Sequence, residues 1–404
     1  MSQACRSCGN ELEVVLDLGV TPLANSLLRE DQLDQPEERF PLRLAICRGC
    51  ALPQLMETVP PQALFTDYPY FSSFSDTMVR SARDLVRTLV RSRALGPDSL
   101  ALEVASNDGY LLRHYLEAGV PVLGIEPAKN VAAAAQDAGI PTMCEFFGRD
   151  LGSRLRSDGR LADVVHANNV VAHVPDLNGL FAGFEALLKP GGLLIIEVPH
   201  VLEMVRRLEF DTIYHEHVFY FSLSSLKPVF ERHGLHITDV ERLPLHGGSL
   251  RIFGARENQP APAVDQVLAE EKAAEVNGPG FYTDFNARVN RLGTRLEELL
   301  SGLQREGERI AAYGASAKGS TLLNHFGIGR ETLEFVADRS TAKHGLFTPG
   351  THLPILPPDA LRERMPDSVL LLTWNFADEI LEQQREYRER GGRFIVPVPE
   401  PRLL

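Results

Sequence analysis

Hydrophobic and polar residues follow two different periods along the middle of the chain. Stretches with helical spacing separate short apolar runs of the kind that form buried strands. These runs lie at residues 100–105, 120–125, 163–167 and 193–198. Strands that alternate with helices favour a parallel sheet with crossover connections. Two closer runs follow at 236–243 and 249–254, and the short loop between them predicts an antiparallel pair at one end of a seven-stranded sheet.

The pattern changes on both sides of this region. Residues 13–18 and 42–46 are strand-like runs within a cysteine-containing start, and residues 76–95 have the spacing of a helix. Residues 257–264 predict a linker because proline, alanine and polar residues dominate them. Residues 265–306 are charged and amphipathic, so we expect long connecting helices there.

The alternation of strands and helices restarts near Arg309 and predicts a second, smaller α/β unit. Its strand-like runs lie at 309–313, 333–337, 368–372 and 393–396. We therefore predict three domains, with the boundaries 1–75, 76–256 and 257–404. No internal repeat interrupts this division.

The composition is that of an ordinary globular protein, with 44% hydrophobic and 24% charged residues among 404. No run of about 18 apolar residues is present, so we expect no membrane partner, and the N-terminus lacks the apolar segment of a signal peptide. These features predict a cytoplasmic location. The formal net charge of −13 argues against nucleic acid as a partner, because phosphate neutralisation needs a basic face.

Four of the five cysteines form two C-x-x-C pairs, which is metal-binding spacing in a cytosolic chain. The predicted ligands are Cys5, Cys8, Cys47 and Cys50. Four thiolates suit a tetrahedral zinc ion and leave no open position, so the role of the zinc is expected to be structural. Free or redox-active C-x-x-C pairs are the alternative. Cys144 lies in an apolar stretch and is expected to be a core thiol.

A candidate cofactor loop follows the first predicted strand of the middle domain, in the sequence LALEVASNDGYLL. Gly109 lets the backbone approach a ligand closely, and Asn107 and Asp108 can bond its polar groups. Glu126 stands at the end of the next strand, where an acid can hold two ribose hydroxyls. The loop lacks G-x-G-x-x-G, which disfavours NAD. The predicted cofactor-binding residues are Glu103, Ala105, Asn107, Asp108, Gly109, Glu126, Pro127, Asn168 and Asn169.

Two segments carry candidate proton-handling groups. In VVHANNVVAHVPD a strand ends at Asn168 and Asn169, and His173 follows in a loop. In TIYHEHVFYFS, Tyr214, His215, Glu216 and His217 are consecutive, and a histidine near neutral pKa is a natural base for a carbon acid. A polar loop with incidental histidines, or metal binding by His215 and His217, are alternatives.

A second loop of small residues, AYGASAKGSTLLN, leads from a predicted strand into a helix. Its helix start, with Ser316 and Lys318, suits a phosphate, although Lys318 precedes Gly319 and the loop is therefore no Walker A motif. A simple tight turn is the alternative. Asn324 closes this segment. A glycine bend, LHGGSLR, carries His246 and Arg251 and is either part of the substrate site or a packed surface loop.

Together these segments resemble the C-methyltransferases that act on nucleotide-linked deoxysugars, of the sugar 3-C-methyltransferase type found in antibiotic pathways. The resemblance runs through CRSCG, LDLGVTPLAN, CRGC, DYPYFSSFSDTM, EVASNDGYLL, NNVVAHVPD, YHEHVFYFS, HGGSLR and YGASAKGSTLLN, in that order. It implies a class I methyltransferase Rossmann-like sheet that binds S-adenosylmethionine, an N-terminal zinc module and a C-terminal Rossmann-like α/β domain. Ala105 stands where many methyltransferase loops have glycine.

The resemblance also implies roles for single residues. His217 would remove a proton from a sugar carbon beside a 4-keto group, Tyr214 and Glu216 would line the same site, and His173 and Tyr70 would face the sugar. The predicted catalytic residues are thus His217, Tyr214, Glu216, His173 and Tyr70. The predicted substrate-binding residues are Ser316, Lys318, Asn324, His246 and Arg251, with the diphosphate at Ser316 and Lys318.

The leading hypothesis is therefore methylation of a ring carbon, the C3 position, of a nucleoside diphosphate 4-keto-deoxysugar by a monomeric enzyme. Carbon has no lone pair to offer, so an enolate must form first, which needs a base and hydrogen-bond donors. An oxygen or nitrogen methyltransferase is the first alternative. The second is a zinc-containing scaffold whose α/β domains do no chemistry.

Overall fold

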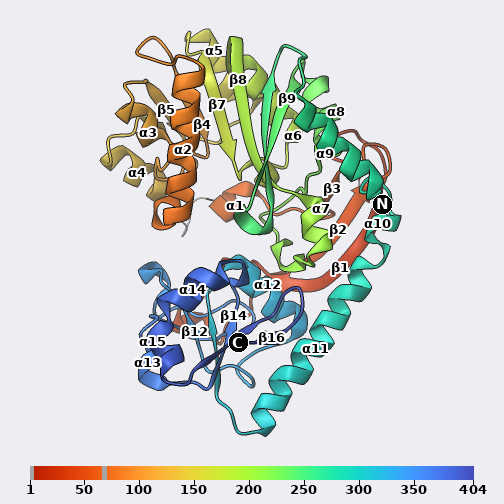
Figure 1. The fold of residues 1–404 in the computed structure, drawn as a ribbon, viewed down its shortest axis with the longest axis vertical. Helices are drawn as coiled ribbons and strands as arrows, with labels where there is room; N and C mark the ends of the chain where they lie inside the picture. Colours follow the sequence, from red (N-terminus) through yellow and green to blue (C-terminus); the bar gives the residue numbers. More distant parts are fainter. Residues whose placement is uncertain (1–3, 66–70) are drawn as a thin grey trace.

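The structure, a computed structural model, describes residues 4–65 and 71–404. Figure 1 shows two large lobes, one above the other, with the N-terminal strands and the long helix α11 (Phe285–Arg305) along one side of both. Each lobe contains its own sheet, and a third, smaller sheet belongs to the N-terminal module. Within the described residues no helix combines the length and the apolar character that a membrane span requires.

The N-terminal module is a three-stranded antiparallel sheet in the order β1-β2-β3. Its elements are β1 (Leu12–Pro22), β2 (Arg39–Cys47), β3 (Pro53–Leu55) and the short helix α1 (Pro61–Phe65). The outer edge of β3 does not face solvent, because Gln54 forms a bridge with Phe219 of the middle domain. The module is therefore joined to the chain far beyond it through main-chain pairing.

The middle domain has the predicted seven-stranded sheet, in the order β6-β5-β4-β7-β8-β10-β9. The strands are β4 (Ala101–Val104), β5 (Val122–Ile125), β6 (Thr142–Met143), β7 (Ala162–Asn168), β8 (Leu188–Pro199), β9 (His236–Leu243) and β10 (Ser249–Ala255). Strand β10 runs antiparallel to both β8 and β9, and this confirms the antiparallel pair at one end. The carboxyl ends of β4, β5 and β7 share one edge, where ligands bind in open α/β sheets.

Helices cover both faces of this sheet. They are α2 (Asp76–Ser92), α3 (Leu112–Glu117), α4 (Lys129–Asp137), α5 (Arg149–Ser157), α6 (Leu177–Leu187) and α8 (Leu223–Arg232). Helix α7 (Val201–Arg206) packs instead with apolar side chains of the N-terminal and C-terminal parts. Helix α2 begins at Ser75, whose hydroxyl accepts from the Met78 N–H, and its apolar stripe packs on the sheet. This helix matches the sequence-based prediction for residues 76–95.

The predicted linker is shorter than expected, because helix α9 (Pro262–Ala273) begins inside it. Proline is tolerated in the first turn of a helix, where its missing N–H has no partner to lose. Val264 and Val267 pack into the core of the middle domain, so this helix belongs structurally to that sheet. Helices α10 (Gly280–Thr283) and α11 then lead to the second lobe, as the amphipathic stretch predicted.

The C-terminal domain is a six-stranded sheet in the order β13-β12-β11-β14-β15-β16, parallel except for its last strand. Its strands are β11 (Ile310–Tyr313), β12 (Val336–Ala337), β13 (Ile355–Leu356), β14 (Ser368–Leu371), β15 (Arg393–Val396) and β16 (Arg402–Leu403). Its helices are α12 (Ala317–Phe326), α13 (Ala360–Arg364), α14 (Ala377–Gln383) and α15 (Arg385–Glu389). The second Rossmann-like α/β unit is thus confirmed.

One apolar cluster is shared by all three parts of the chain. It joins Leu16 and Leu44 of the N-terminal sheet, Val205 and Tyr220 of the middle domain, and Leu322 of helix α12. Burial of such side chains contributes about 25 cal/mol per Å² of apolar surface, so the three parts stabilise one another.

The expectation for Cys144 was wrong, because its side chain is exposed. It follows β6, an edge strand of two residues, and the chain leaves the sheet there.

Candidate functional site

The four predicted cysteine ligands converge at one end of the N-terminal module. Their sulfur atoms all lie within 4.8 Å of one another, and Cys5–Cys50 and Cys8–Cys47 are 3.7 and 3.4 Å apart. A tetrahedral zinc–thiolate site, with bonds of about 2.3 Å, requires sulfur separations of roughly 3.8 Å. The cluster therefore fits zinc, and four protein ligands leave no position for chemistry.

N–H donors surround these sulfur atoms, as is usual for thiolates that bind a metal. The side-chain amide of Gln54 donates to the Cys5 sulfur over 3.0 Å. The backbone N–H groups of Ser7, Gly49 and Cys50 donate to the sulfur atoms of Cys5 and Cys47. Gln54 therefore connects the metal cluster to strand β3.

The alternative metal pair of His215 and His217 is not formed. The His215 ring is buried against the N-terminal module, where its Nε2 lies 3.2 Å from the Pro41 carbonyl. His217 lines a cavity in the middle of the molecule instead. Among residues 4–65 and 71–404, the four cysteines are the only group of three or more potential ligands.

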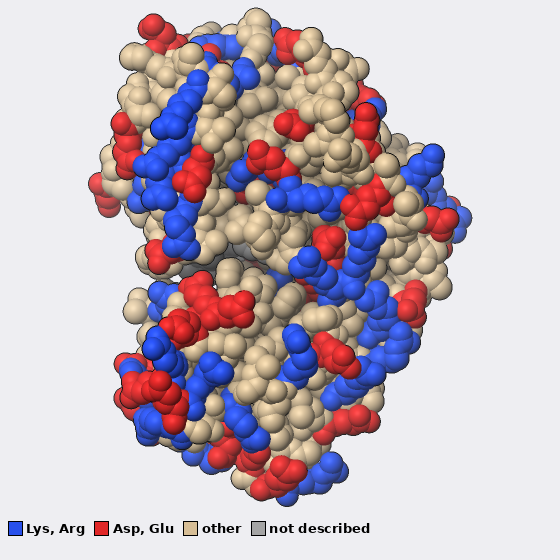
Figure 2. All heavy atoms as spheres, viewed as in Figure 1, with Lys and Arg blue, Asp and Glu red and all other residues tan. Residues whose placement is uncertain are grey.

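That cavity, of about 390 Å³, lies between the carboxyl edge of the seven-stranded sheet and the C-terminal domain. Figure 2 shows the hollow between the two lobes on the left of the molecule. All three parts of the chain contribute to its wall, including Asn25 from the N-terminal module, Asn168 from β7 and Ser316 from the start of α12. It is the site that the predicted cofactor and catalytic residues have in common.

The candidate cofactor loop after β4 is a tight turn with several left-handed residues. Ala105, Asn107 and Gly109 have φ values of 52°, 49° and 76°. The Glu126 carboxylate closes the turn by accepting from the backbone N–H groups of Asn107 and Ala128, each over 2.9 Å. Burial raises the pKa of Glu126, and these two hydrogen bonds oppose that shift.

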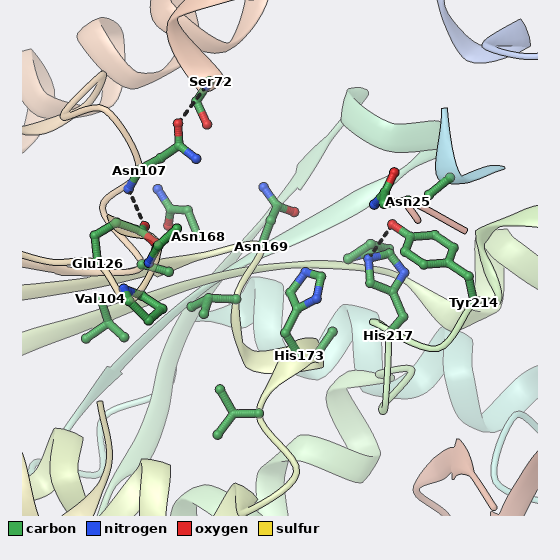
Figure 3. Close-up of a pocket in the computed structure, with 18 of the residues that line it drawn as sticks. Asn25, Ser72, Val104, Asn107, Glu126, Asn168, Asn169, His173, Tyr214 and His217 are labelled. Atoms are coloured by element: carbon green, nitrogen blue, oxygen red, sulfur yellow. Dashed lines mark hydrogen bonds between the residues drawn. The ribbon is translucent and has the colours of Figure 1, made fainter. Parts of the chain in front are cut away.

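Six of the nine predicted cofactor residues line the cavity: Ala105, Asn107, Glu126, Pro127, Asn168 and Asn169. They come from the ends of β4, β5 and β7, as expected for a ligand at this edge (Figure 3). The Asn168 Oδ1 atom is buried and has no hydrogen-bond partner in the described part of the chain. Such an orphaned acceptor inside a cavity fits a polar ligand that donates to it.

The other three predicted cofactor residues, Glu103, Asp108 and Gly109, are not in the cavity wall. Asp108 accepts from the backbone N–H of Ser73 over 3.3 Å, and the Asn107 side chain accepts from Ser72 over 2.8 Å. These two side chains therefore anchor the segment before α2. Glu103 is fully buried within the sheet, and burial with the nearby Glu126 raises its pKa well above the ordinary value.

Tyr214 and His217 form a hydrogen-bonded pair in the cavity wall. A turn from Tyr214 to His217 brings the two rings to a centroid separation of 4.1 Å, and the Tyr214 hydroxyl lies 2.8 Å from His217 Nε2. His217 Nδ1 lies 2.9 Å from the Thr212 carbonyl, which can only accept, so Nδ1 carries the proton. In the neutral ring Nε2 therefore carries the lone pair and accepts from the Tyr214 hydroxyl.

His173 packs edge-on against His217 at a centroid distance of 4.8 Å (Figure 3). Its Nδ1 donates to the Glu216 carbonyl over 2.8 Å. Burial lowers the pKa of His173 to about 4, only partly offset by hydrogen bonds to carbonyl groups. The ring is therefore neutral near pH 7.

Glu216 is buried and outside the cavity wall. Its carboxylate accepts from the Asn25 side-chain amide over 2.6 Å. Tyr70, the fifth predicted catalytic residue, lies outside the described residues.

The C-terminal domain closes the cavity from the other side. The Ser316 hydroxyl caps helix α12 by accepting from the Gly319 N–H over 3.1 Å, and Ser316 and Lys318 both line the cavity. The Lys318 ammonium lies over the Trp374 ring, 4.8 Å from the ring centroid. It is buried and has no hydrogen-bond partner among residues 4–65 and 71–404.

The predicted residues Asn324 and Arg251 do not reach this cavity. Asn324 donates to the Ser320 and Pro349 carbonyls and fixes a loop behind α12. Arg251 is buried within the sheet and pairs with Glu197 of β8, its register partner, and with Glu241 of β9. Strand β10 turns this guanidinium under α2, where its Nη2 donates to the Ser81 hydroxyl over 3.3 Å, so Arg251 does not make the predicted contribution to the cavity. The His246 side chain lies outside the described part of the structure.

Several cavity residues were missed by the sequence analysis, among them Asn25, Lys343 and Thr373. The ammonium of Lys343 donates to the Ala315 carbonyl over 2.8 Å and lies 3.8 Å from Asp338. These residues stand in separate loops with no motif of their own. Only Asn25 could have been identified from the sequence, because it is the last residue of the segment LDLGVTPLAN.

Comparisons with known proteins find three family models that match successive parts of the chain. Residues 5–65 match a family model for a zinc binding domain, residues 78–240 one for a methyltransferase domain, and residues 244–399 one for the C-methyltransferase C-terminal domain. The chain is 38% identical to the C-methyltransferase NovU from Streptomyces niveus over 405 residues, which covers 99% of this chain and 96% of that protein.

Other similarities are local. An uncharacterised methyltransferase of Mycobacterium leprae is 32% identical over 97 residues, or 24% of this chain and 36% of that protein. Among solved structures, magnesium protoporphyrin IX methyltransferase of Synechocystis, with bound S-adenosylmethionine, is 15% identical. The match covers 44% of this chain and 79% of that one, with a TM-score of 0.35.

Proposed function

The chain belongs to the family of S-adenosylmethionine-dependent C-methyltransferases that have an N-terminal zinc-binding domain, and from this premise we propose that it methylates a ring carbon, C3, of a nucleoside diphosphate 4-keto-deoxysugar. One observation carries the proposal. The Tyr214–His217 pair lies in a cavity between the candidate cofactor loop of one domain and the start of helix α12 in the other.

Bound S-adenosylmethionine supplies an electrophilic methyl group that a carbon nucleophile accepts, and it leaves as S-adenosylhomocysteine. The residues that would hold it are those of the cavity wall at the sheet edge: Ala105, Asn107, Glu126, Pro127, Asn168 and Asn169. Glu126 is placed for a ribose diol, and Asn168 Oδ1 for a donor. Glu103, Asp108 and Gly109 would shape this site from behind rather than touch the ligand.

His217 is the base in this proposal. Its Nδ1–H is held by the Thr212 carbonyl, so Nε2 takes the proton from the carbon beside the ketone. The C–H electron pair moves to the ketone oxygen as an enolate. The Tyr214 O–H donates to Nε2 in the ligand-free protein and would turn to the ketone oxygen when the substrate binds, which leaves the Nε2 lone pair for the proton and gives the developing enolate a hydrogen-bond donor.

The neutral state of His173 favours this proton transfer. With a pKa of about 4, His173 carries no charge near pH 7. A second imidazolium 4.8 Å away would oppose the gain of a proton by His217. The burial that keeps His173 neutral thus makes it easier for His217, the proposed base, to accept a proton.

The diphosphate would lie at the start of helix α12. Its N-terminus provides backbone N–H donors, and the buried Lys318 ammonium lacks an acceptor among the described residues. Lys343 lies in the same wall and adds a second positive charge. Lys318 and Lys343 would then neutralise the group that distinguishes a nucleotide sugar from a free sugar.

We would test this function with S-adenosylmethionine and a panel of nucleoside diphosphate 4-keto-6-deoxy sugars. The expected product is heavier by one methylene unit and has a carbon-bound methyl signal by NMR. The same sugars with a 4-hydroxyl group in place of the ketone should not react. Methylation of the 4-hydroxy sugars, or of oxygen, would contradict the enolate mechanism.

The role of His217 has a separate test that needs no methyl donor. In D₂O the wild-type protein should exchange the proton beside the ketone for deuterium, and His217→Asn should lose this exchange by a factor of at least about 100. His215→Asn is the matched control, because that ring faces the N-terminal module. Equal exchange by wild-type and His217→Asn protein would exclude His217 as the base.

A further inference from the structure

Asn25 is the point at which the zinc-binding module reaches the cavity. It lies after β1, in a module whose metal cluster is held by residues 5–50, yet its side chain stands beside Tyr214 and His217 (Figure 3). It is part of the cavity wall, half-buried, and comes from neither of the two α/β domains.

The orientation of this amide follows from its partner. The Glu216 carboxylate accepts only, so the atom of Asn25 that faces it over 2.6 Å is the Nδ2 donor. The amide Oδ1 is then turned away from Glu216. No other hydrogen bond of the Asn25 side chain occurs among residues 4–65 and 71–404, so Oδ1 remains an open acceptor in the wall of the cavity.

Glu216 itself is fixed on several sides. It is 4% exposed, its carbonyl accepts from His173, and the residues before and after it are held by hydrogen bonds to Pro41 and Thr212. The fixed Glu216 carboxylate therefore supports the Asn25 amide, because it allows only one of the two orientations in which the amide oxygen and nitrogen exchange places.

We propose that Asn25 is a substrate-binding residue that accepts a hydrogen bond from a hydroxyl group next to the reacting carbon, and that Glu216 positions its amide. The inference rests on the proposed function, because only a hydroxylated acceptor offers that donor. It gives the zinc-binding module a direct part in substrate selection. It also changes the role of Glu216 from a group that contacts the substrate to a positioning residue.

The test compares Asn25→Ala and Glu216→Gln with the wild type in the methylation assay, with Ser26→Ala as the control. Ser26 is the exposed neighbour of Asn25 in the same loop. Asn25→Ala should raise the KM for the keto sugar about 10- to 100-fold, with unchanged zinc content and S-adenosylmethionine affinity. Glu216→Gln should give a smaller rise, because a glutamine can either accept from Nδ2 or donate to Oδ1 of Asn25 and so no longer selects one amide orientation.

Two results would overturn the inference. One is a substrate KM for Asn25→Ala equal to that of Ser26→Ala. The other is a loss of zinc or of cofactor affinity in Asn25→Ala, which would mean that the residue supports the fold.

A substrate-free measurement keeps this test separate from the proposed function. In protein labelled with [¹⁵N]asparagine, Glu216→Gln should move the Asn25 side-chain signal, and an unmoved signal refutes the positioning. If the wild type methylates no keto sugar although this signal moves, the acceptor class is wrong, and with it the hydroxyl contact proposed for Asn25.

Discussion

Ala105 occupies a backbone position that suits glycine better. Its φ of 52° is left-handed, a region that costs an L-residue about 1 kcal/mol. We expect Ala105→Gly to raise the melting temperature slightly or leave it unchanged, with unaltered affinity for S-adenosylmethionine. Differential scanning calorimetry and titration calorimetry measure both.

Ala134→Gly is the matched control for this change. Ala134 lies inside helix α4, where glycine costs roughly 1 kcal/mol relative to alanine. The two substitutions should therefore move stability in different directions or by clearly different amounts. An equal loss at both positions would show that the turn at Ala105 is not under strain.

Some site residues can be predicted from local sequence patterns, whereas others reach the site only through the tertiary fold. Cys5 and Cys8 are identifiable because metal geometry imposes local spacing. Asn25 and Lys343 reach the cavity only through the packing of distant segments, which no local pattern encodes. Arg251 was misassigned because a sequence does not distinguish a charged residue that awaits a ligand from one already paired with Glu197.

At the scale of elements, strand β3 connects the metal cluster to the loop that contains His217. Gln54 donates to a cysteine sulfur, and its strand pairs with the chain just after His217. The Leu55 N–H donates to the Val218 carbonyl over 2.8 Å, and the Tyr220 N–H donates to the Pro53 carbonyl over 3.0 Å. The position of His217, the proposed base, thus depends on strand β3, whose Gln54 contacts the metal cluster.

Removal of zinc should therefore loosen the loop that contains His217. After chelation we expect faster hydrogen–deuterium exchange both in β3 and in residues 218–220, because these two segments share hydrogen bonds. Strand β14, in the C-terminal sheet, provides the internal control. Unchanged protection of 218–220 in the zinc-free protein would contradict this dependence.

The sequence predicts which segments form strands and helices more reliably than it predicts the residues at which they begin and end. The strands of the two parallel sheets follow from apolar runs, because burial on both faces imposes a continuous signal. Helix α9 was read in part as linker, since proline and alanine at 260–263 have no periodicity of their own. Its start is set by the packing of Val264 on the middle domain, which is a tertiary effect.

At the scale of the whole molecule, buried acids accompany the contact between the two large domains. Asp211 accepts from the Trp374 indole N–H over 2.6 Å, and Glu209 lies nearby. Burial raises the pKa of Glu209 to about 7, although the Lys318 charge opposes the shift. One carboxyl group of this interface therefore titrates near neutral pH.

This raised pKa predicts a pH-dependent stability. Because the folded protein binds a proton that the unfolded chain has lost, stability should fall as the pH rises from about 4.5 to about 7, by roughly 3 kcal/mol. Glu209→Gln should therefore be more stable than the wild type at pH 8 and similar to it at pH 4.5. Chemical denaturation at both values measures this difference.

Glu231→Gln is the control at a surface position. Glu231 pairs with Lys227 one helical turn away, and exposed pairs of this type contribute about 0.5 kcal/mol. Its effect should be small at both pH values. A Glu209→Gln variant that is less stable than the wild type at pH 8 would show that its attraction to Lys318 outweighs the cost of its burial.

The pairing of β3 with residues 218–220 has a consequence for how the protein is made. While the ribosome synthesises the first hundred residues, the module can bind zinc, but the partner of its edge strand does not yet exist. Its apolar side chains also await α11 and α12, which are translated later still. The packing of the module is therefore expected to be completed only after α11 and α12 have been translated, and a nascent chain stalled before residues 218–220 would present the open edge of β3 to chaperones.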